Sequence, residues 1–600
     1  MFQSFEVASR PDTGAGRLAE LRGELRKDGL DGFLVPRSDA HQGENVAARD
    51  ERLCWLTSFT GSAGFCAALL DRAGVFIDGR YRVQVVREIA ADHFSAVHWP
   101  EVSLADWLRE ALAAGGTIGF DPWLHTAKEI EKLREDLAGS AIEMRATDNL
   151  VDRIWEDQPP PPIGKIVAYP LEHAGQSSVD KRAVLAEGLR AAKQVAAVIT
   201  LPDSIAWLLN VRGSDVVRVP VPHGFLILRD DASARLFVDP DKVGGLAGHL
   251  GGDVALDEPG AFLPALAALG SVVRVDKATA PLKISEILSA AGVKIDWGQD
   301  PCILPKARKN DVEIAGTVAA HLRDAAAMVE CLAWLDEEAP KGALSEIDVV
   351  RRLEGFRRAT NALLDISFET ICGAGPNAAI VHYRVDEASN RAIKPGELLL
   401  IDSGGQYIDG TTDITRTVAV GAVGGDERAA FTRVLQGMIA ISRVRWPKGL
   451  AGRDLDALAR QALWAAGQDY DHGTGHGVGT YLSVHEGPQG ISRRSDVALE
   501  PGMILSNEPG YYRPGSFGIR TENLLVVRKA AQIDGADARD MLSFQTLTFV
   551  PVDRRLIDVG MLNADERAWI NAYHSVVHDK IAPRVCEAAR QWLALAVAPI

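Results

Sequence analysis

The stretch that decides the fold of the C-terminal half is residues 396–420, GELLLIDSGGQYIDGTTDITRTVAV. An apolar run, typical of a buried strand, leads into Asp402, and the alternating TDITRTV that contains Asp413 is typical of a second strand. The glycines and the Asp-Gly pair between them predict a turn within residues 405–410, so we expect the strands to pair antiparallel. The two carboxylates would then lie opposite or diagonal, roughly 5–8 Å apart. Bare carboxylates this close repel each other, which indicates a bound cation.

A second hairpin is predicted in residues 502–527, GMILSNEPGYYRPGSFGIRTENLLVV. Strands over residues 503–508 and 518–527 would flank a loop near Pro514-Gly515 and bring Glu508 and Glu522 together. Any one of the four acidic residues could be a solvated loop charge. Four of them in two hairpins favour one shared site.

Residues 472–488, HGTGHGVGTYLSVHEGP, add three of the fourteen histidines. His472 and His476 have the spacing of a helical zinc pair, but each intervening glycine disfavours a helix by about 1 kcal/mol relative to alanine. We therefore expect a loop or a kinked strand. The glycines do not follow the GxGxxG spacing of a dinucleotide site, and no strand and helix frame them. They are expected instead to let the backbone crowd a ligand or a metal.

The composition limits the class of protein. A chain of 600 residues is too long for one core. Its formal net charge of −16 argues against nucleic acid or an anionic membrane as the partner. No apolar run reaches the ~20 residues of a membrane span, and no signal or transit peptide is evident, so a cytoplasmic location is expected. The six cysteines lack any CxxC spacing and are expected to be buried small hydrophobes.

Upstream, two segments share one layout: a helix, an apolar strand, a turn with proline, a WL…GS segment, and a strand ending at Asp78 or Asp239. Chance similarity is the alternative, but we favour an internal duplication that gives two α/β domains. Four consecutive prolines, residues 159–162, mark one boundary. Asn310 and Glu313 form a capping box that starts the next helix. We expect domains over residues 1–158, 159–308 and 309–600, the last of class α+β.

The ordered motifs LLLIDSGGQY, DGTTDITRT, HGTGHGVG, SNEPGYY and GIRTEN resemble those of the pita-bread metallopeptidases, which include methionine aminopeptidase, prolidase and aminopeptidase P. The resemblance implies two creatinase-like α/β domains followed by a pita-bread catalytic domain. It also implies the ligands of a two-metal centre, namely Asp402, Asp413, His476, Glu508 and Glu522. Four carboxylates and a neutral imidazole carry four negative charges, which two divalent cations balance. Mn²⁺ is implied by the family, with Zn²⁺ or Co²⁺ as substitutes.

The resemblance also covers IVHYR and SVHEGP, and so carries over His382, His472 and His485 as active-site histidines that bind no metal. Imidazoles can stabilise a developing oxyanion or protonate a departing nitrogen. Both actions matter for a bond before proline, whose nitrogen has no N–H. In this reading His382 and His485 act on the carbonyl or the proline nitrogen, and His472 lines the proline pocket. Glu508 would also shuttle the proton of the attacking water.

Three further residues have assigned roles. Arg520 is expected to hold ligand carboxylates in place, with a surface ion pair as the alternative. Tyr512 is expected to reach the site. By resemblance Arg80 in DGRY contacts substrate, although a structural salt bridge near Asp78 is an open alternative.

Further matches, such as SDAHQ, FTGSAGF, NLVDRIW, IAWLLNVRGSD and LTFVPVD, extend the resemblance over almost the whole chain. They favour the three-domain aminopeptidases P, which are hydrolases that remove an N-terminal residue preceding proline. We then expect a homodimer that acts on small peptides with proline second, without nucleic acid or membrane partners. Two alternatives remain: a prolidase that cuts only Xaa-Pro dipeptides, and a catalytically silent pita-bread module that binds peptides. Silent relatives lose metal ligands, whereas all five are present here.

Overall fold

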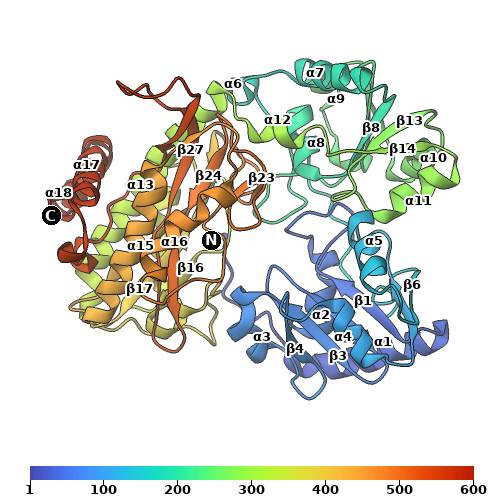
Figure 1. Ribbon diagram of the computed structural model, residues 1–600, viewed down its shortest axis with the longest axis horizontal. Coiled ribbons are helices and arrows are strands. Elements are labelled where there is room, and N and C mark those ends of the chain that lie inside the picture. The colour runs from blue at the N-terminus through green and yellow to red at the C-terminus, as the bar shows by residue number, and fades with distance from the viewer. The chain divides into compact units, whose positions relative to one another are not determined.

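The computed structural model describes residues 1–600, except for the side chain of residue 247, and the chain forms two compact units (Figure 1). The N-terminal unit is Ala8–Lys306, and the C-terminal unit is Met1–Val7 together with Ala307–Ile600. The sequence did not predict that Met1–Val7 would join the C-terminal unit. Gln3 shows how it does so, because its side chain accepts a hydrogen bond from Thr370 N at 2.8 Å and donates one to Thr370 O at 3.2 Å.

The N-terminal unit contains two six-stranded sheets with the same topology. In spatial order the first is β4 (Ser95–His98), β3 (Ala73–Ile77), β2 (Phe65–Leu69), β1 (Gly32–Pro36), β5 (Gly116–Phe120) and β6 (Ile142–Ala146). The second is β12 (Val254–Asp257), β11 (Ala234–Phe237), β10 (Phe225–Arg229), β8 (Ala196–Ile199), β13 (Val272–Val275) and β14 (Lys294–Trp297). In both sheets the strands pair antiparallel in the middle and parallel toward the edges. This shared order and direction is what the predicted duplication requires.

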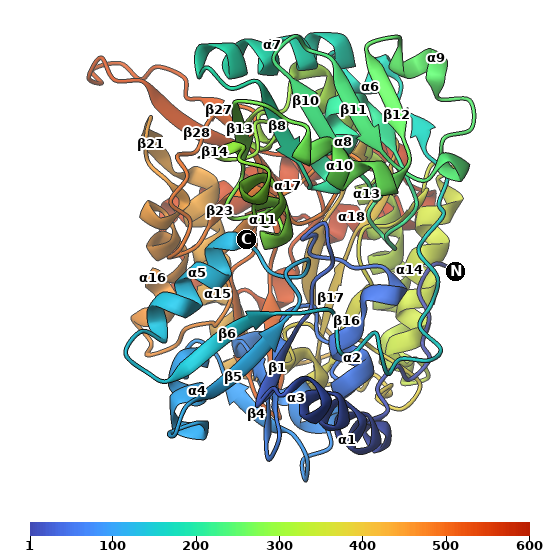
Figure 2. The same cartoon turned by 90° about the vertical axis from the view of Figure 1, so that its right-hand side faces the viewer.

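Helices cover both faces of the first sheet (Figure 2). Phe33 and Val35 of β1 pack against α1 (Pro11–Asp28) and α2 (Arg52–Thr57). Leu34, between them, packs in the core under α4 (Leu104–Ala111) and α5 (Ala127–Asp136). Successive side chains of a strand point to opposite faces, so a continuous apolar run fits a strand buried on both sides. The α/β prediction for this unit is therefore confirmed.

The C-terminal unit combines helices and mainly antiparallel sheets, and its predicted α+β class is confirmed. It opens with the predicted capping box, in which Asn310 and Glu313 begin α13 (Asp311–Glu338). The other main helices are α14 (Glu346–Ala359), α15 (Gly425–Arg443), α16 (Asp456–Trp464), α17 (Ala564–Ile581) and α18 (Glu587–Ala596). Figure 1 shows α13, α15 and α16 beside the strands of this unit.

Two of its sheets carry the predicted hairpins. One has the order β16 (Ile371–Ala374), β17 (Leu398–Ser403), β20 (Ile414–Ala419). The other has the order β21 (Arg445–Pro447), β28 (Met541–Thr546), β27 (Asn523–Lys529), β24 (Ile504–Asn507), β22 (Gly475–Gly477), β23 (Glu486–Ile491). Strands β17 and β20 pair antiparallel with Asp402 opposite Thr415, so Asp413 lies diagonal to Asp402, as predicted. The connection between them forms a small hairpin of its own, β18 (Gly405–Tyr407) and β19 (Gly410–Thr411).

The second hairpin differs from its prediction, because each expected strand is divided in two. Strand β24 pairs with β27 up to Asn507 opposite Asn523, and a separate pair, β25 (Gly510–Arg513) and β26 (Phe517–Arg520), follows. Pro509 has no N–H to contribute to a ladder, which accounts for the break. Glu508 and Glu522 fall at the break, and their backbone N–H groups turn to other segments: Glu508 N donates to Thr474 O at 2.8 Å and Glu522 N to Thr415 O at 3.2 Å.

No helix among the described residues combines the length and hydropathy needed to cross a bilayer. All six cysteines are free, as predicted. Cys66, Cys302, Cys331 and Cys372 are buried, whereas Cys54 is partly exposed and Cys586 is exposed, so the burial predicted for all six is wrong for these two.

Candidate metal centre

The structure brings the five predicted ligands into one cluster of the C-terminal unit. Ligand atoms of Asp413, His476 and Glu522 all lie within 4.8 Å of one another. His476 Nε2 is 3.5 Å from Asp413 Oδ2 and 3.4 Å from Glu508 Oε1. The carboxyl of Asp402 interacts electrostatically with those of Asp413 and Glu508.

Local strand geometry aims these side chains. His476 stands in β22, where the register with β23 shifts between His476 and Gly477, which is the kinked strand that the glycines predicted. Two of the glycines lie where backbones approach each other closely. A Cβ on Gly475 would lie 2.0 Å from Ser506 O, and one on Gly477 would lie 2.2 Å from Glu486 O. Gly475 and Gly477 therefore allow neighbouring strands to approach closely.

The hydrogen bonds of His476 fix which ring nitrogen faces the cluster. Its Nδ1 lies 2.9 Å from Gly477 O, a carbonyl that can only accept, so Nδ1 carries the proton. Nε2 therefore faces the Asp413 and Glu508 carboxylates, and its lone pair becomes available there when it gives up its proton to bind a cation. An imidazole held by a backbone carbonyl in this way is the usual arrangement of a metal-binding histidine.

The carboxylates lie in surroundings that disfavour their charge. Burial, together with Asp413 and Glu508, raises the pKa of Asp402 to about 7, although Arg520 opposes the rise. Burial also raises the pKa of Glu508, and it raises the pKa of Glu522 well above the usual range, where the neighbouring carboxylates add to the effect. Although burial alone would lower it, the hydrogen bond with Asp413 and the charge of Glu508 raise the pKa of His476 to about 9. The cluster thus holds more negative charge than its own residues balance.

The donor set fits divalent cations. Asp402 Oδ1, Asp413 Oδ1 and Glu522 Oε1 are buried and have no hydrogen-bond partner among the described residues, although buried carboxylate oxygens are normally satisfied. A bound cation would satisfy all three and remove the repulsion. Oxygen donors with one imidazole and no thiolate suit Mn²⁺ and similar hard or borderline ions.

Arg520 is a buried residue that hydrogen-bonds to the carboxylate cluster. It is 2% exposed and its Nη2 donates to Asp402 Oδ2 at 2.6 Å, so it is not the surface ion pair considered as an alternative. Its Nη1 donates to Tyr512 OH at 2.6 Å, and its Nε donates to Thr415 Oγ1 at 3.2 Å. The guanidinium therefore connects the Asp402 carboxylate with two hydroxyl groups.

Tyr512 extends the hydrogen-bond network from Arg520 to His472. The hydroxyl accepts from Arg520, so it donates to His472 Nε2, 2.8 Å away. On the other side of the ring, His472 Nδ1 donates to Gly473 O at 2.8 Å. The imidazole is thereby held in one orientation, with the rings of Tyr470 and Tyr512 at 4.8 and 5.4 Å between centroids.

The other predicted histidines lie near the same cluster. The ring of His485 stands edge-on to that of His476, with 4.3 Å between centroids. His382 is partly buried and follows Val381, whose carbonyl oxygen is 3.5 Å from Arg520 Nη2. Arg80 belongs to the N-terminal unit, where its Nη2 pairs with Asp78 Oδ2 at 2.6 Å, the salt bridge that the sequence left open.

Sequence reasoning missed two hydroxyl residues that orient ligands. Thr415 Oγ1 donates to Glu522 Oε2 at 2.7 Å, and Ser506 Oγ donates to Glu508 Oε1 at 3.1 Å. Ser506 Oγ also accepts from His476 N at 2.9 Å. Thr415 stands two residues after Asp413, and Ser506 two before Glu508, so the two-residue period of a strand was the available signal.

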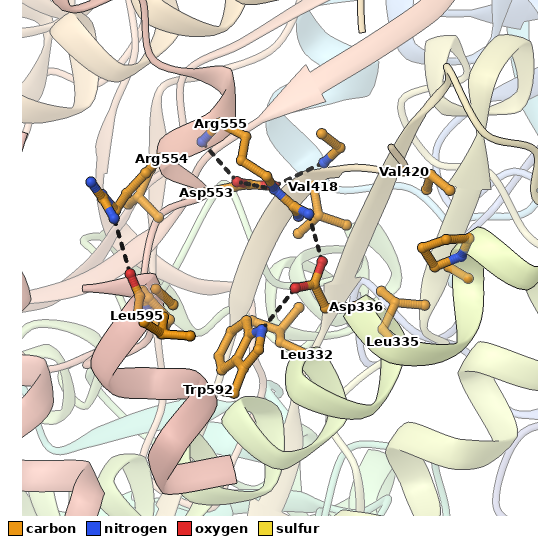
Figure 3. Close-up of a pocket in the computed structure, with 16 residues that line it drawn as sticks. Leu332, Leu335, Asp336, Val418, Val420, Asp553, Arg554, Arg555, Trp592 and Leu595 are labelled. Carbon is orange, nitrogen blue, oxygen red and sulfur yellow. Dashed lines mark hydrogen bonds and ion pairs between the residues drawn. The ribbon is translucent and has the colours of Figure 1, made fainter. Parts of the chain in front are cut away.

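A separate hollow of about 220 Å³ in this unit contains none of these residues (Figure 3). Its floor is mainly aliphatic, formed by α13, the end of β20 and α18. Its charged groups are already bonded: Arg555 bonds both Asp553 and Asp336, Trp592 Nε1 donates to Asp336 at 3.0 Å, and Arg554 donates to Leu595 O at 3.0 Å. It therefore lacks the converging donors of the metal cluster.

Three buried carboxylates and a partly buried one, presented by two hairpins, converge with a histidine of a third strand, and this set defines a metallopeptidase. The chain belongs to metallopeptidase family M24, which residues 316–529 match. Residues 17–154 and 157–313 each match the creatinase/prolidase N-terminal domain, and residues 540–600 match the C-terminal region of the M24 peptidases. These matches confirm the family resemblance and the predicted class of all three regions.

Within that family the chain is similar to the aminopeptidases P. Aminopeptidase P2 of Arabidopsis thaliana is 40% identical over 94% of this chain and 85% of its own length. A probable Xaa-Pro aminopeptidase P of Paracoccidioides brasiliensis (strain Pb03) is 38% identical over 97% of this chain and 99% of its own length. The X-prolyl aminopeptidase of Caenorhabditis elegans, described as a cytosolic enzyme with a di-nuclear active site, has a TM-score of 0.93 at 33% identity, over 98% of this chain and all of that one.

Proposed function

We propose that this chain is an Xaa-Pro aminopeptidase, a hydrolase that removes the first residue of a peptide when proline is second. The observation that carries the proposal is the cluster of Asp402, Asp413, His476, Glu508 and Glu522, in which three carboxylate oxygens are buried without a hydrogen-bond partner. The full-length similarity to aminopeptidases P supports the substrate class.

These five residues would hold two divalent cations, for which we propose Mn²⁺, with Zn²⁺ or Co²⁺ able to substitute. When bound, such a pair lowers the pKa of water and polarises a carbonyl. The chain's own groups supply the rest. Glu508 lies at the edge of the cluster, and its raised pKa suits a carboxylate that takes the proton of the attacking water and passes it on.

The histidines act on the substrate. We assign His485 the hydrogen bond to the scissile carbonyl oxygen as negative charge develops on it, and its position beside His476 supports this role. His382 is assigned to the carbonyl or to the proline nitrogen, which must gain a proton to leave because it carries no N–H. His472, fixed between Tyr512 and Gly473 O, offers a ring face beside Tyr470 that suits the apolar proline ring. We assign Arg80 a contact to the peptide beyond proline.

We further propose a cytosolic homodimer organised in three domains, over residues 1–158, 159–308 and 309–600, with Met1–Val7 of the first segment packed on the third. The C. elegans relative, which is cytosolic, supports the location. The repeated sheet topology supports the first domain boundary.

The test follows release of the first residue from Arg-Pro-Pro and from Arg-Ala-Ala, with added Mn²⁺ and with a chelator. We expect cleavage of Arg-Pro-Pro only, and loss of this activity on chelation. Comparable cleavage of Arg-Ala-Ala would remove the chain from the proline-specific enzymes.

Adding the dipeptide Arg-Pro as a third substrate decides between two alternatives. A prolidase would cut the dipeptide Arg-Pro and leave Arg-Pro-Pro intact. A silent peptide-binding module would cut neither, but the presence and convergence of all five acidic and histidine residues disfavour this reading.

A further inference from the structure

The segment that carries His485, residues 479–486, is here called the His485 loop. Gly479 N donates to Ser483 O at 2.9 Å and closes it. Tyr481 has a φ of +47°, a conformation that non-glycine residues rarely adopt without support from their surroundings. Part of that support comes from buried Gln406 of β18, whose Nε2 donates to Leu482 O at 2.8 Å. The neighbouring structure therefore imposes the conformation of the loop.

The other side of the His485 loop is held by Lys309. Lys309 Nζ pairs with Glu486 Oε2, although 177 residues separate the two in sequence. The side chains are 1% and 0% exposed. Glu486 directly follows His485, and a Cβ on Gly479 would lie 3.1 Å from Glu486 Oε1. The Glu486 carboxylate therefore lies against Gly479, the first residue of the loop, although Glu486 is the last. The ion pair with Lys309 thus holds both ends of the loop.

Lys309 is itself anchored to the strand that leads to a metal ligand. Its backbone N donates to Gly502 O at 3.1 Å, and Gly502 precedes β24, which ends just before Glu508. The ammonium group thus connects the strand leading to Glu508 with the residue next to His485. Burying two charges is costly, and a hydrophobic pair of similar size is often as stable, so stability alone is a weak reason for such a pair.

We propose that Lys309 is a positioning residue for His485, and this inference rests on the proposed function, in which His485 acts on the scissile carbonyl. Through Glu486, Lys309 holds the His485 imidazole edge-on to His476 at 4.3 Å between centroids. If the loop relaxes, substrate still binds to the rest of the site, but the imidazole no longer meets the carbonyl oxygen. A displacement of about 1 Å costs on the order of 100-fold in rate.

The experiment compares Lys309→Met, the double variant Lys309→Met/Glu486→Leu, and Arg308→Met. Arg308 is the matched control, because it is the preceding residue and forms a partly exposed ion pair with Glu500 at 2.5 Å. Each protein is measured for kcat and KM on Arg-Pro-Pro, for bound manganese, and for thermal melting.

We expect Lys309→Met to lower kcat by about 10- to 100-fold with KM changed less than about threefold. It is also expected to melt earlier, because it leaves a buried carboxylate without its counter-charge. The double variant removes that carboxylate, so its melting temperature should recover while its kcat stays low. Bound manganese should be unchanged in both, and Arg308→Met should match the wild type.

A double variant with wild-type kcat would overturn the proposal, since the pair would then serve stability alone. Manganese loss in proportion to kcat would overturn it too, because the effect would lie at the metal ligands. Failure of the wild type to cleave Arg-Pro-Pro would instead remove the proposed function, and the inference with it. That outcome is distinguishable, because it is seen before any variant is made.

Discussion

Thr415→Val removes one hydroxyl that serves two buried groups of the metal cluster. Thr415 Oγ1 donates to Glu522 Oε2 at 2.7 Å and accepts from Arg520 Nε at 3.2 Å, and the residue is 0% exposed. Valine has a similar shape but can make neither bond. A hydrogen bond to a charged group contributes about 1.5–3 kcal/mol, which corresponds to roughly 10- to 100-fold in an equilibrium constant.

The loss should appear in cation binding. Burial raises the pKa of Glu522, and the Thr415 hydrogen bond opposes this rise. Without the hydroxyl, the pKa rises further and protons compete more strongly with cations for the carboxylate. The Mn²⁺ concentration for half-maximal activity should therefore increase by about 10- to 100-fold, while activity at saturating Mn²⁺ changes less.

The assay titrates chelator-stripped protein with Mn²⁺ and follows release of the first residue from Arg-Pro-Pro. Thr432→Val is the control, because its buried hydroxyl donates within α15, to Arg428 O at 2.8 Å, and contacts no ligand. If Thr415→Val needs no more Mn²⁺ than the wild type and the control, Glu522 is not a ligand held in the way described, and the reasoning fails.

Four other changes have defined outcomes. Asp413→Asn should reduce bound manganese below that of the wild type, measured by elemental analysis after gel filtration, because it removes one of the clustered carboxylates. Glu346→Gln should lower the free energy of unfolding, measured in urea, by about 1.5–3 kcal/mol, because the buried carboxylate accepts from Tyr383 OH at 2.9 Å and from Ala374 N at 2.7 Å. It should also reduce kcat, because Ala374 and Tyr383 flank His382 in the sequence. Burial, with nearby Arg416 and Arg554, lowers the pKa of His574 from 6.5 to about 3. The free energy of unfolding should therefore be unaffected by this group above pH 6.5 and should fall as the pH drops from 6.5 toward 3, by at most about 1.4 kcal/mol per pH unit. His574→Gln should reduce this pH dependence, measured by urea unfolding at each pH. Gly475→Ala should cost about 2–3 kcal/mol and weaken Mn²⁺ binding, because its Cβ would lie 2.0 Å from Ser506 O; wild-type melting and Mn²⁺ affinity would contradict the close strand approach.

The hairpin from Asp402 to Asp413 was predictable because its cause is local. An apolar strand, a turn and an alternating strand lie within 25 residues, and antiparallel pairing then fixes which residues are neighbours. The capping box of Asn310 and Glu313 is local in the same sense. The duplicated N-terminal sheets were predictable because the layout is repeated in the sequence.

The structure around the break at Pro509 was only partly predictable from the sequence. The proline was visible, but the partners that replace the ladder, Thr474 O for Glu508 N and Thr415 O for Glu522 N, come from other segments of the chain. The series of hydrogen bonds from Arg520 through Tyr512 to His472 was also not predictable from the sequence, because it depends on how two sheets pack.

The sequence by itself determined the hairpin of Asp402 and Asp413 and the approach of Glu508 to Glu522, because strand period and turn chemistry act over a few residues. Its ordered motifs also supplied the five candidate metal ligands, through the family resemblance. Only the tertiary structure decided what holds those ligands and the histidines in place. Lys309 meets Glu486 across 177 residues, and Met1–Val7 joins the C-terminal unit across more than 300. Such contacts are selected by the packing of whole elements, for which no short pattern in the sequence provides a signal.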